Sequence, residues 1–236
     1  MEYKNLTIIG TSHIAKQSLD EVKNLIENNK PDLITLELDK KRYAALTQKN
    51  KEKGKLSLYY IKRIGIKGFI FSLIGAWVQQ KLGKHVGVVP GSDMLQAIEL
   101  AKKHKIKIAL IDQDIEVTLR KFSKSLTWKE KWNFIVDLFN AIVLRKKEVT
   151  FDLTKVPEKK LIKKLIGIVK QRYPNIYRVL VEERNEIMAK RLVMIMKENP
   201  DMKIISVVGA GHEEDMIEII KNRLNKVEIT YSFSVD

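Results

Sequence analysis

The sequence predicts an α/β protein with a mostly parallel central sheet, and three observations support this class. Short runs rich in Ile, Leu and Val are typical of strands covered by helices on both faces. Helical patterns separate these runs, as in β-α-β units, so the strands are expected to be parallel. The 236 residues are 44% hydrophobic and 31% charged, a balance that excludes a disordered chain. We expect a single domain over residues 1–236.

Four apolar runs are the predicted buried strands: Leu6–Ile9, Leu33–Leu38, Ile106–Ile111 and Ile204–Val208. A fifth run, Val227–Phe233, alternates in polarity and is expected to form an antiparallel strand at the sheet edge. Three strands therefore come early and the others follow a long interval. The sheet is expected to be split by an insertion.

Capping patterns mark the predicted helices between these strands. Ser18 with Glu21 forms the S-x-x-E pattern of a helix start before the second strand. Ser92 can cap a helix over Asp93–His104, which leads into the third strand. A last helix is expected over Glu213–Leu224, directly after the fourth strand.

Two segments, residues 56–84 and 117–200, interrupt this plan and are expected to be helical insertions. In the second, Thr127 and Glu130 form another capping pattern, and Pro157 and Pro174 mark breaks in the helix. In the first, apolar residues recur near helical spacing after a basic start. That pattern fits a helix packed on the core, a lid over a site, or a helix on a membrane surface.

Charge and composition exclude several classes of protein. Lys and Arg number 44 against 29 Asp and Glu, a net charge of +15 that predicts a lysine-rich solvated surface or an anionic partner such as a lipid surface. Neither a phosphate-binding glycine loop nor a nucleic-acid motif is visible, so no specific nucleic-acid partner is expected. The absence of cysteine excludes disulfides, thiolate metal sites and a cysteine nucleophile. The polar start is no signal peptide, and the longest apolar run, 69–78, is too short to span a bilayer.

A short repeat places histidines at two strand ends. Residues 8–13 read Ile-Ile-Gly-Thr-Ser-His, and residues 207–212 read Val-Val-Gly-Ala-Gly-His. Glycine lets the chain turn sharply off each strand. Ligands of open α/β sheets bind at the carboxyl edge of the strands, which is where His13 and His212 are expected.

Acidic residues end the other two strands. Glu37 lies in an apolar run, where an unpaired carboxylate would be costly, and Arg42 can supply a cation. With Asp112 from the third strand, Glu37 is expected to meet His13 and His212. Such a set fits the ligands of Zn²⁺, Mn²⁺ or Co²⁺, which would activate a bound water, or a metal-free acid/base pair. The alternative is that both histidines only cap helices or satisfy buried backbone.

Segments spread over nearly the whole chain, in order, resemble the motifs of the TraB/PrgY family. They are Gly10-Thr11-Ser12-His13, Leu36–Tyr43, Pro90–Met94, Leu110–Ile115 with Arg120, Glu183–Ala189 and Gly209-Ala210-Gly211-His212. The family is related to the Tiki proteins, which resemble metal-dependent proteases, and more distantly to erythromycin esterase and ChaN-like proteins. The resemblance implies one TraB-type domain with a split-barrel-like or open α/β core of the erythromycin esterase/ChaN-like kind.

The resemblance also implies site residues. It makes His13, Glu37 and His212 the leading metal or catalytic residues, with Arg42 and Arg184 beside them. Without it, a surface charge pair would be the favoured interpretation of Glu183 and Arg184. The matched motifs imply further pocket residues: Tyr43, Asp93, Asp114, Arg120, Glu183 and Asn185. Asp93 stands where glutamate is commoner in the family.

These features predict a metal-dependent hydrolase, with a peptide as the expected substrate. Glu37 is the expected ligand or general base, and Arg42 or Arg184 is expected to stabilise the oxyanion. The alternative is a non-enzymatic protein that sequesters a peptide, as the pheromone-shutdown members of the family are thought to do. A basic peripheral membrane or nucleic-acid binder is a third alternative.

Two expectations concern assembly and location. The long insertion between the halves of the sheet could exchange between subunits, which makes a homodimer plausible. TraB-like proteins of archaea and bacteria often continue into C-terminal membrane helices, and none is present in this sequence. We expect a cytoplasmic soluble domain, either complete in itself or part of a longer membrane-anchored protein.

Overall fold

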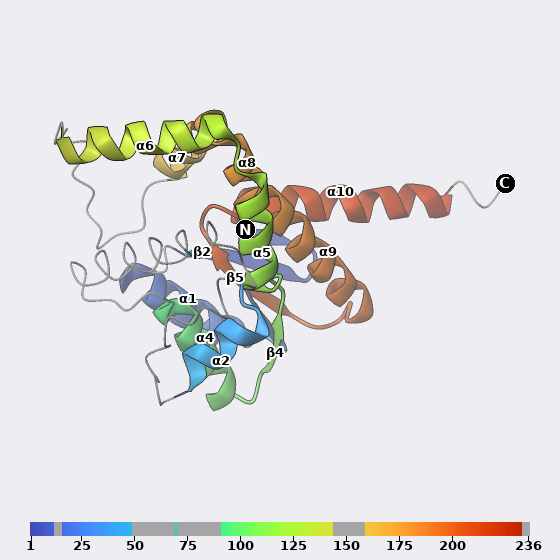
Figure 1. Ribbon diagram of the computed structural model, residues 1–236. Coiled ribbons are helices and arrows are strands. Elements are labelled where there is room, and N and C mark those ends of the chain that lie inside the picture. Colours follow the sequence, from blue (N-terminus) through green and yellow to red (C-terminus); the bar gives the residue numbers. More distant parts are fainter. Residues whose placement is uncertain (12–15, 49–68, 70–90, 144–158, 233–236) are drawn as a thin grey trace.

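The structure, a computed structural model, describes residues 1–11, 16–48, 69, 91–143 and 159–232 (Figure 1). In these residues a five-stranded sheet has the order β1-β2-β5-β3-β4. Its strands are β1 (Glu2–Tyr3), β2 (Leu6–Thr11), β3 (Leu33–Leu36), β4 (Lys107–Leu110) and β5 (Ile204–Gly209). β1 is antiparallel to β2, and the other pairs are parallel. The predicted α/β class with a mostly parallel sheet is confirmed.

All four predicted strands are present; β4 lies at the sheet edge and is only partly buried, whereas β5 lies at the centre of the sheet. β5 follows the long helical insertion in sequence but pairs with β2 on one side and β3 on the other. In this register Thr11 lies opposite Gly209, and Leu36 lies opposite Val207. The residues that follow β5 are therefore brought beside the residues that follow β3.

Helices cover both faces of the sheet (Figure 1). α1 and α4 pack on one face, and α9 and α10 pack on the other. The helical elements are α1 (Lys16–Asn29), α2 (Lys40–Thr47), α4 (Ser92–Lys103), α5 (Ile115–Ser125), α6 (Trp128–Val143), α7 (Lys159–Arg172), α8 (Pro174–Tyr177), the π-helical η1 (Arg178–Glu182), α9 (Glu183–Glu198) and α10 (Glu213–Ser232). None of these described helices is long and apolar enough to cross a membrane.

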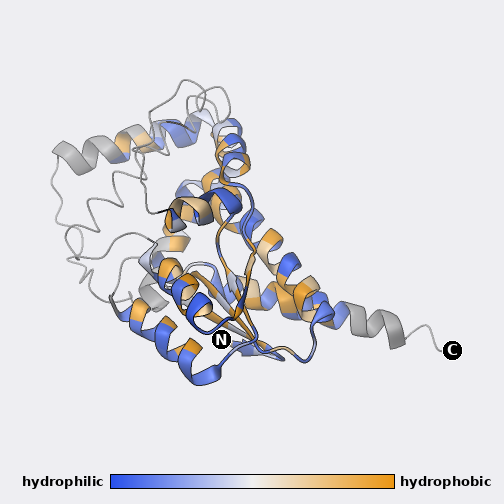
Figure 2. Cartoon of the chain, turned by 90° about the horizontal axis from the view of Figure 1, so that it is seen from below, coloured by the Kyte–Doolittle hydropathy of each residue, from blue (hydrophilic) through white to orange (hydrophobic). Residues whose placement is uncertain are grey.

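The central strand shows why both faces are apolar. Ile204 and Val208 of β5 join the core under α9 and α10, whereas Ile205 and Val207 join the core under α1 and α4. Successive strand side chains point to opposite faces, so a strand buried on both sides reads as a continuous apolar run. Burying each such side chain contributes about 1.5–3 kcal/mol. Figure 2 shows the hydrophobic colour concentrated on the strands and on the inward sides of the helices.

The predicted edge strand Val227–Phe233 is wrong, because α10 continues as a helix to Ser232. The antiparallel edge is formed instead by β1, at the start of the chain. Met1 reinforces this pairing: its amino group donates to the Ile8 carbonyl (2.6 Å) and its carbonyl accepts from the Ile8 N–H (2.7 Å). The N-terminus thus occupies the edge of β2.

Two predicted caps are also wrong. α1 begins at Lys16, so Ser18 lies inside the helix, where it is fully buried. α4 begins at Ser92 itself, and its N-cap is Gly91, whose φ of 82° is left-handed and favours glycine. Both helices begin earlier than the serine pattern suggests.

From α5 to α9, most of the described residues between 117 and 200 are helical. The Thr127–Glu130 capping box is present, with Thr127 N–H donating to Glu130 Oε2 (3.1 Å) and Glu130 N–H donating to Thr127 Oγ1 (3.3 Å). Pro174 begins α8, as expected of a helix break. Pro157 and, apart from Phe69, residues 56–84 lie outside the described residues.

Candidate functional site

Polar side chains from four separate segments meet at the carboxyl edge of the sheet. Glu37 follows β3, Asp112 follows β4 and His212 follows β5, while Arg184 comes from α9. The three strand-end residues are only 5%, 3% and 8% exposed, respectively. We call these four residues the Arg184 cluster. The predicted meeting of Glu37, Asp112 and His212 is thus found in the structure.

Arg184 binds both carboxylates of the cluster. Its Nη2 donates to Glu37 Oε1 and to Asp112 Oδ2 (2.6 Å), and its Nε donates to Asp112 Oδ1 (3.1 Å). Burial alone would lower the pKa of Arg184, but attraction to Glu37 and the hydrogen bond to Asp112 outweigh it and raise that pKa above its ordinary value. The buried guanidinium therefore stays charged, and it neutralises the carboxylates around it.

A π-helical turn supplies another acceptor to Arg184. Its Nη1 donates to the backbone carbonyl of Leu180 in η1 (3.1 Å). In this turn the N–H of Glu183 bonds to the carbonyl of Arg178, five residues back. π turns inside helices occur frequently at functional sites. This turn could not be predicted from the sequence, because its i→i+5 bonding leaves no residue signature.

Both carboxylate oxygens of Glu37 lie close to nitrogen atoms of other residues. The backbone N–H of Gly209 donates to Oε2 (2.6 Å), and His212 Nε2 lies 3.5 Å from Oε1, the oxygen bound by Arg184. The backbone of Glu37 is fixed as well, because its N–H donates to the carbonyl of Val207 (3.1 Å). These contacts explain how a carboxylate is stabilised inside an apolar strand run.

A chain of hydrogen bonds fixes the proton on His212. Asn185 Nδ2 faces Asp215 Oδ2 (3.2 Å), and Asn185 Oδ1 faces His212 Nδ1 (2.5 Å). A carboxylate only accepts, so the amide nitrogen must face Asp215 and the amide oxygen must face the imidazole. Nδ1 therefore carries the proton in neutral His212. Its Nε2 is left as the basic nitrogen, 3.4 Å from Arg184 Nη1.

A second arginine holds the other side of Asp112. Arg42 Nη2 donates to Asp112 Oδ2, and Arg42 Nε donates to Asp39 Oδ2 (2.8 Å). Asp39 also caps α2 by accepting from the N–H of Lys41 (2.7 Å). Arg191 Nη1 donates to the backbone carbonyl of Asp112 (2.6 Å). Arg42 thus lies beside the cluster, but the cation that pairs with Glu37 is Arg184 rather than Arg42.

Three other predicted pocket residues lie near the sheet edge without a described contact to the cluster. Asp93, in the first turn of α4, is buried and accepts from the hydroxyl of Thr11. Asp114 caps α5 and pairs with Lys41 Nζ (2.8 Å). Tyr43 packs against the core under α1 and α4.

Two predicted residues lie on the surface. Arg120 is exposed on α5. Glu183 pairs with Lys121 (2.6 Å) and Arg178 (3.8 Å), whereas Arg184 lies in the cluster and pairs with Glu37 and Asp112. His13 lies outside the residues that the structure describes.

Asp215 is a site residue that the sequence reasoning missed. It lies in the first turn of α10, three residues after His212, and it holds both Asn185 and the hydroxyl of Tyr177 (3.5 Å). Burial, together with the carboxylates of Asp215 and Glu182, raises the pKa of Tyr177, so its hydroxyl stays protonated and donates. The only sequence feature that could have indicated Asp215 is its position, about one helical turn after the strand-end residue His212.

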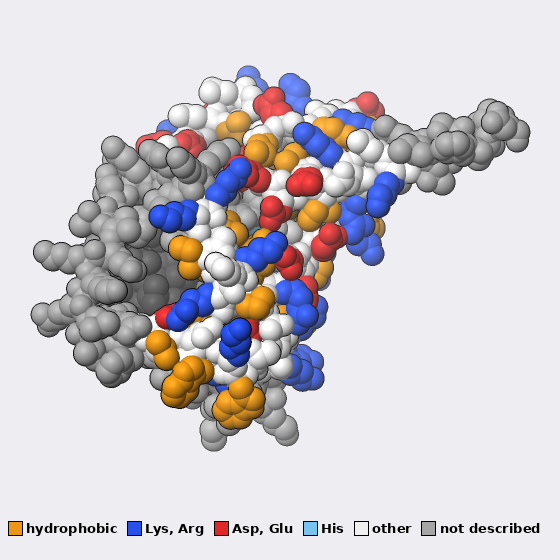
Figure 3. Space-filling view, turned by 90° about the horizontal axis from the view of Figure 1, so that it is seen from above, with side chains coloured by type: hydrophobic (Ala, Val, Ile, Leu, Met, Phe, Trp, Pro, Cys, Tyr) orange, Lys and Arg blue, Asp and Glu red, His pale blue; other side chains and the backbone are white. Residues whose placement is uncertain are grey.

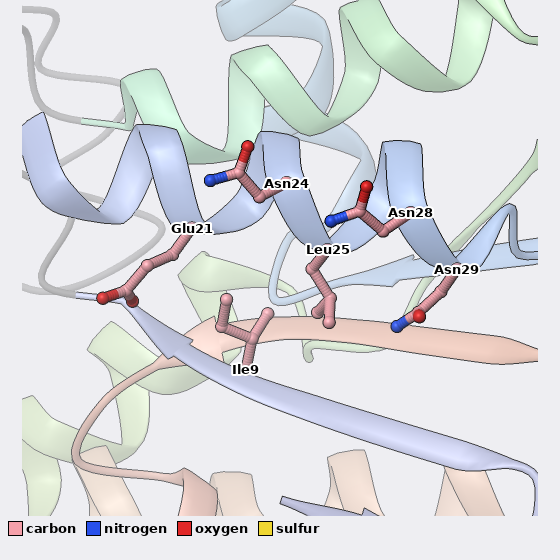
Figure 4. A pocket seen from close by; sticks show the side chains of 6 residues that line it. All are labelled: Ile9, Glu21, Asn24, Leu25, Asn28 and Asn29. Atoms are coloured by element: carbon pink, nitrogen blue, oxygen red, sulfur yellow. The ribbon is translucent and has the colours of Figure 1, made fainter.

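Two hollows lie in the described surface. One, of about 470 Å³, adjoins the cluster through Asn185 and Asp215, and Glu182, Glu186 and Glu218 make it acidic. The other, of about 430 Å³, lies between α1 and β2 and contains no residue of the cluster (Figure 4). It is lined by Ile9, Glu21, Asn24, Leu25, Asn28 and Asn29.

The described residues do not by themselves fit a divalent metal. The guanidinium of Arg184 takes the position between Glu37 and Asp112 that a shared cation would need. Within the described ranges, no group of three or more His, Asp or Glu side chains is arranged to hold a metal ion. His212 does have the orientation of a metal-binding histidine, with Nδ1 bound by Asn185 and Nε2 directed into the site.

Comparison with known proteins identifies the family. Residues 2–222 match the model of the TraB/PrgY/gumN family. An uncharacterized protein of Methanocaldococcus jannaschii is 36% identical over 228 residues, which cover 95% of this chain and 55% of that protein. A human TraB domain-containing protein is 22% identical over 244 residues, covering 94% of this chain and 64% of that protein. The chain therefore spans less than two thirds of either relative, and it belongs to the TraB/PrgY/gumN family.

Proposed function

We propose that this chain is a hydrolase that acts on a peptide-type carbonyl at the Arg184 cluster. The observation that carries the proposal is the buried pair of His212 Nε2 and Glu37 Oε1, 3.5 Å apart beside a permanently charged guanidinium. The pair stands at the carboxyl edge of a parallel sheet, which is where open α/β proteins bind ligands. Burial strengthens each of these electrostatic interactions.

The roles follow from the hydrogen bonds. His212 Nε2 takes a proton from water as the water oxygen attacks the carbonyl carbon, and the resulting imidazolium returns that proton to the leaving amine. Glu37 stabilises the imidazolium, and Asn185 holds the ring. Arg184 and Arg42 supply positive charge for the oxyanion that forms on the carbonyl oxygen.

A metal-dependent form of this proposal rests on His13. It requires the His13 imidazole to join His212 and Glu37, and Arg184 to leave Glu37 Oε1. When bound, Mn²⁺, Co²⁺ or Zn²⁺ would supply an acidified water. Titration calorimetry with each ion tests this form, which predicts binding by the wild type that His13→Ala removes. A wild type that releases no heat with any of the three ions contradicts the metal-dependent form alone.

A non-enzymatic peptide-binding protein is the second candidate. It is favoured by the saturation of the cluster, since Glu37 and Asp112 are each bound by arginine and by backbone N–H groups. A fully satisfied network is rigid and suits stable binding. Peptide binding that survives His212→Ala, without cleavage by either protein, supports this candidate over the hydrolase.

Mass spectrometry of a peptide library tests the hydrolase directly. The library should include Lys and Arg at every position, because the hollow next to Asn185 is acidic. We expect cleavage by the wild type, with or without added metal, and a loss of about 100-fold or more in Glu37→Gln. Met194→Ala, a change at an exposed residue of α9, is the control and should cleave normally.

A further inference from the structure

At the start of α6, Glu130 points inward while Trp128 and Trp132 point outward. Glu130 is only 2% exposed, whereas Trp128 is 84% exposed and Trp132 is 67% exposed. A helix on the surface of a globular protein normally does the reverse and buries its apolar side. This arrangement calls for a partner that covers the two tryptophans.

The inward face is fixed by hydrogen bonds to the segment around α8. Glu130 Oε1 accepts from the N–H of Asn175 (2.7 Å). One turn on, Asn133 Nδ2 donates to the carbonyl of Arg172 (3.2 Å), and one turn further Asp137 accepts from the Arg172 guanidinium (2.5 Å) and the Tyr173 hydroxyl. These three positions lie on one side of the helix. They lock its rotation, so the outward side is set by the fold.

The outward face combines tryptophan with lysine. Trp128 and Trp132 are one helical turn apart and so lie on the same side. Lys131 Nζ lies 4.0 Å from the centre of the Trp128 ring, and Lys129 is exposed beside it. The acids of α6 are both bound by other groups: Glu130 is buried, and Asp137 pairs with Arg172 while remaining partly exposed. Lys and Arg side chains stand beside exposed hydrophobic ones on the face of the molecule seen in Figure 3.

We infer that α6 docks the protein on an anionic lipid surface through Trp128 and Trp132. Tryptophan has an apolar body and a polar N–H, and it is enriched at the level of lipid headgroups. The neighbouring lysines are complementary to anionic headgroups. A second copy of this chain fits less well, because each copy carries a net charge of +15 and the patch itself is basic.

The docking would be parallel to the surface. α6 has 16 residues, fewer than the roughly 20 that a spanning helix needs, and two lysines lie in its first turn. A helix of this kind lies in the interface with its aromatic residues inserted. This inference is independent of the proposed hydrolase and does not involve the Arg184 cluster.

Vesicle co-sedimentation of the full chain tests it, with phosphatidylcholine alone and with added phosphatidylglycerol. At about 0.15 M salt, we expect binding to the anionic vesicles only. Trp128→Ala with Trp132→Ala should weaken that binding by about tenfold or more, because the buried aromatic area is lost. The matched control, Met194→Ala with Val117→Ala, removes exposed apolar side chains elsewhere and should bind like the wild type.

Tryptophan fluorescence shows where the rings lie. In a Trp77→Phe background, only Trp128 and Trp132 emit, and brominated lipid in anionic vesicles should quench them. Absence of quenching overturns the inference, as does binding that the double tryptophan variant retains in full. Gel filtration that shows a dimer lost in that variant, with vesicle binding unchanged, overturns it in favour of a second copy.

Discussion

At the scale of the residue, the hydrogen-bond chain from Asp215 through Asn185 makes a prediction about His212. In the wild type, neutral His212 should carry its proton on Nδ1, because Asn185 Oδ1 can only accept. Nitrogen-15 NMR of the imidazole resolves the two tautomers. In Asn185→Leu we expect a mixed tautomer and an activity about 10–100-fold lower.

The control for that experiment is Asn28→Leu, which changes an exposed asparagine of α1 in the hollow that contains no residue of the cluster. It should leave the His212 tautomer and the activity unchanged. A proton found on Nε2 in the wild type would contradict the role assigned to Asn185.

Arg184 makes a second prediction, about stability. Arg184→Met leaves Glu37 and Asp112 without their shared cation, and removing one partner from a buried pair costs about 3–5 kcal/mol. Urea unfolding at neutral pH measures this loss. Arg223→Met is the matched control, since it breaks an exposed pair with Glu186 and should cost about 0–1 kcal/mol. Equal losses of stability in the two variants would contradict the stabilising role assigned to the buried ion pairs of Arg184.

At the scale of the element, Glu130 ties the start of α6 to α8. Its carboxylate accepts from Thr127 and from Asn175. Glu130→Gln removes charge-assisted hydrogen bonds, which contribute about 1.5–3 kcal/mol each when buried. We expect a loss of this order in urea unfolding at neutral pH. A change as small as that of the exposed control Glu186→Gln would contradict it.

The same residue predicts a pH dependence. Burial alone would raise the pKa of Glu130, but the hydrogen bonds from Thr127 and Asn175 lower it below its ordinary value of 4.5. A lowered pKa in the folded state stabilises the protein above pH 4.5, and this stability is lost as the pH falls through the folded value. The difference between wild type and Glu130→Gln should therefore shrink as the pH is lowered from 4.5. A stability difference that grows as the pH falls would mean that the pKa of Glu130 is raised, not lowered, in the folded state.

Elements whose patterns are local and strong could be predicted from the sequence. The four strands were found because their sequences are mostly apolar, as is typical of strands between two layers of helices, although β4 at the sheet edge is only partly buried. The serine patterns at Ser18 and Ser92 failed, because the helices begin earlier than the caps suggest. The alternation in residues 227–233 failed as a strand signal because α10 continues as a helix to Ser232, and the antiparallel edge strand is β1.

At the scale of the whole molecule, the strand order explains why the site could be predicted only in part. Glu37, Asp112 and His212 were predicted because parallel strands end at one edge of a sheet. The central place of β5 and the reach of α9 over that edge depend on packing across the whole chain. The bond of Arg184 to two carboxylates at once therefore could not be derived from sequence spacing, and neither could the part played by Asp215.

The net charge of +15 belongs to the surface rather than to the site. Three carboxylates, Glu37, Asp39 and Asp112, face the two arginines Arg42 and Arg184, so these residues together carry a charge of −1. Binding that depends on the surface lysines should weaken with salt, whereas the buried ion pairs should respond little. When both are measured on the same preparation at rising salt concentration, vesicle binding should therefore weaken while peptide cleavage changes little.

The central claim is that the Glu37–His212 pair carries a hydrolytic function, and turnover of a peptide by Glu37→Gln tests it most directly. This change keeps the shape of the side chain and an acceptor for Gly209 N–H, but it removes the charge beside His212. Circular dichroism should show an intact fold. We predict a fall in kcat of about 100-fold or more relative to the wild type and to Met194→Ala. Turnover equal to that of the wild type in the folded variant would contradict the account.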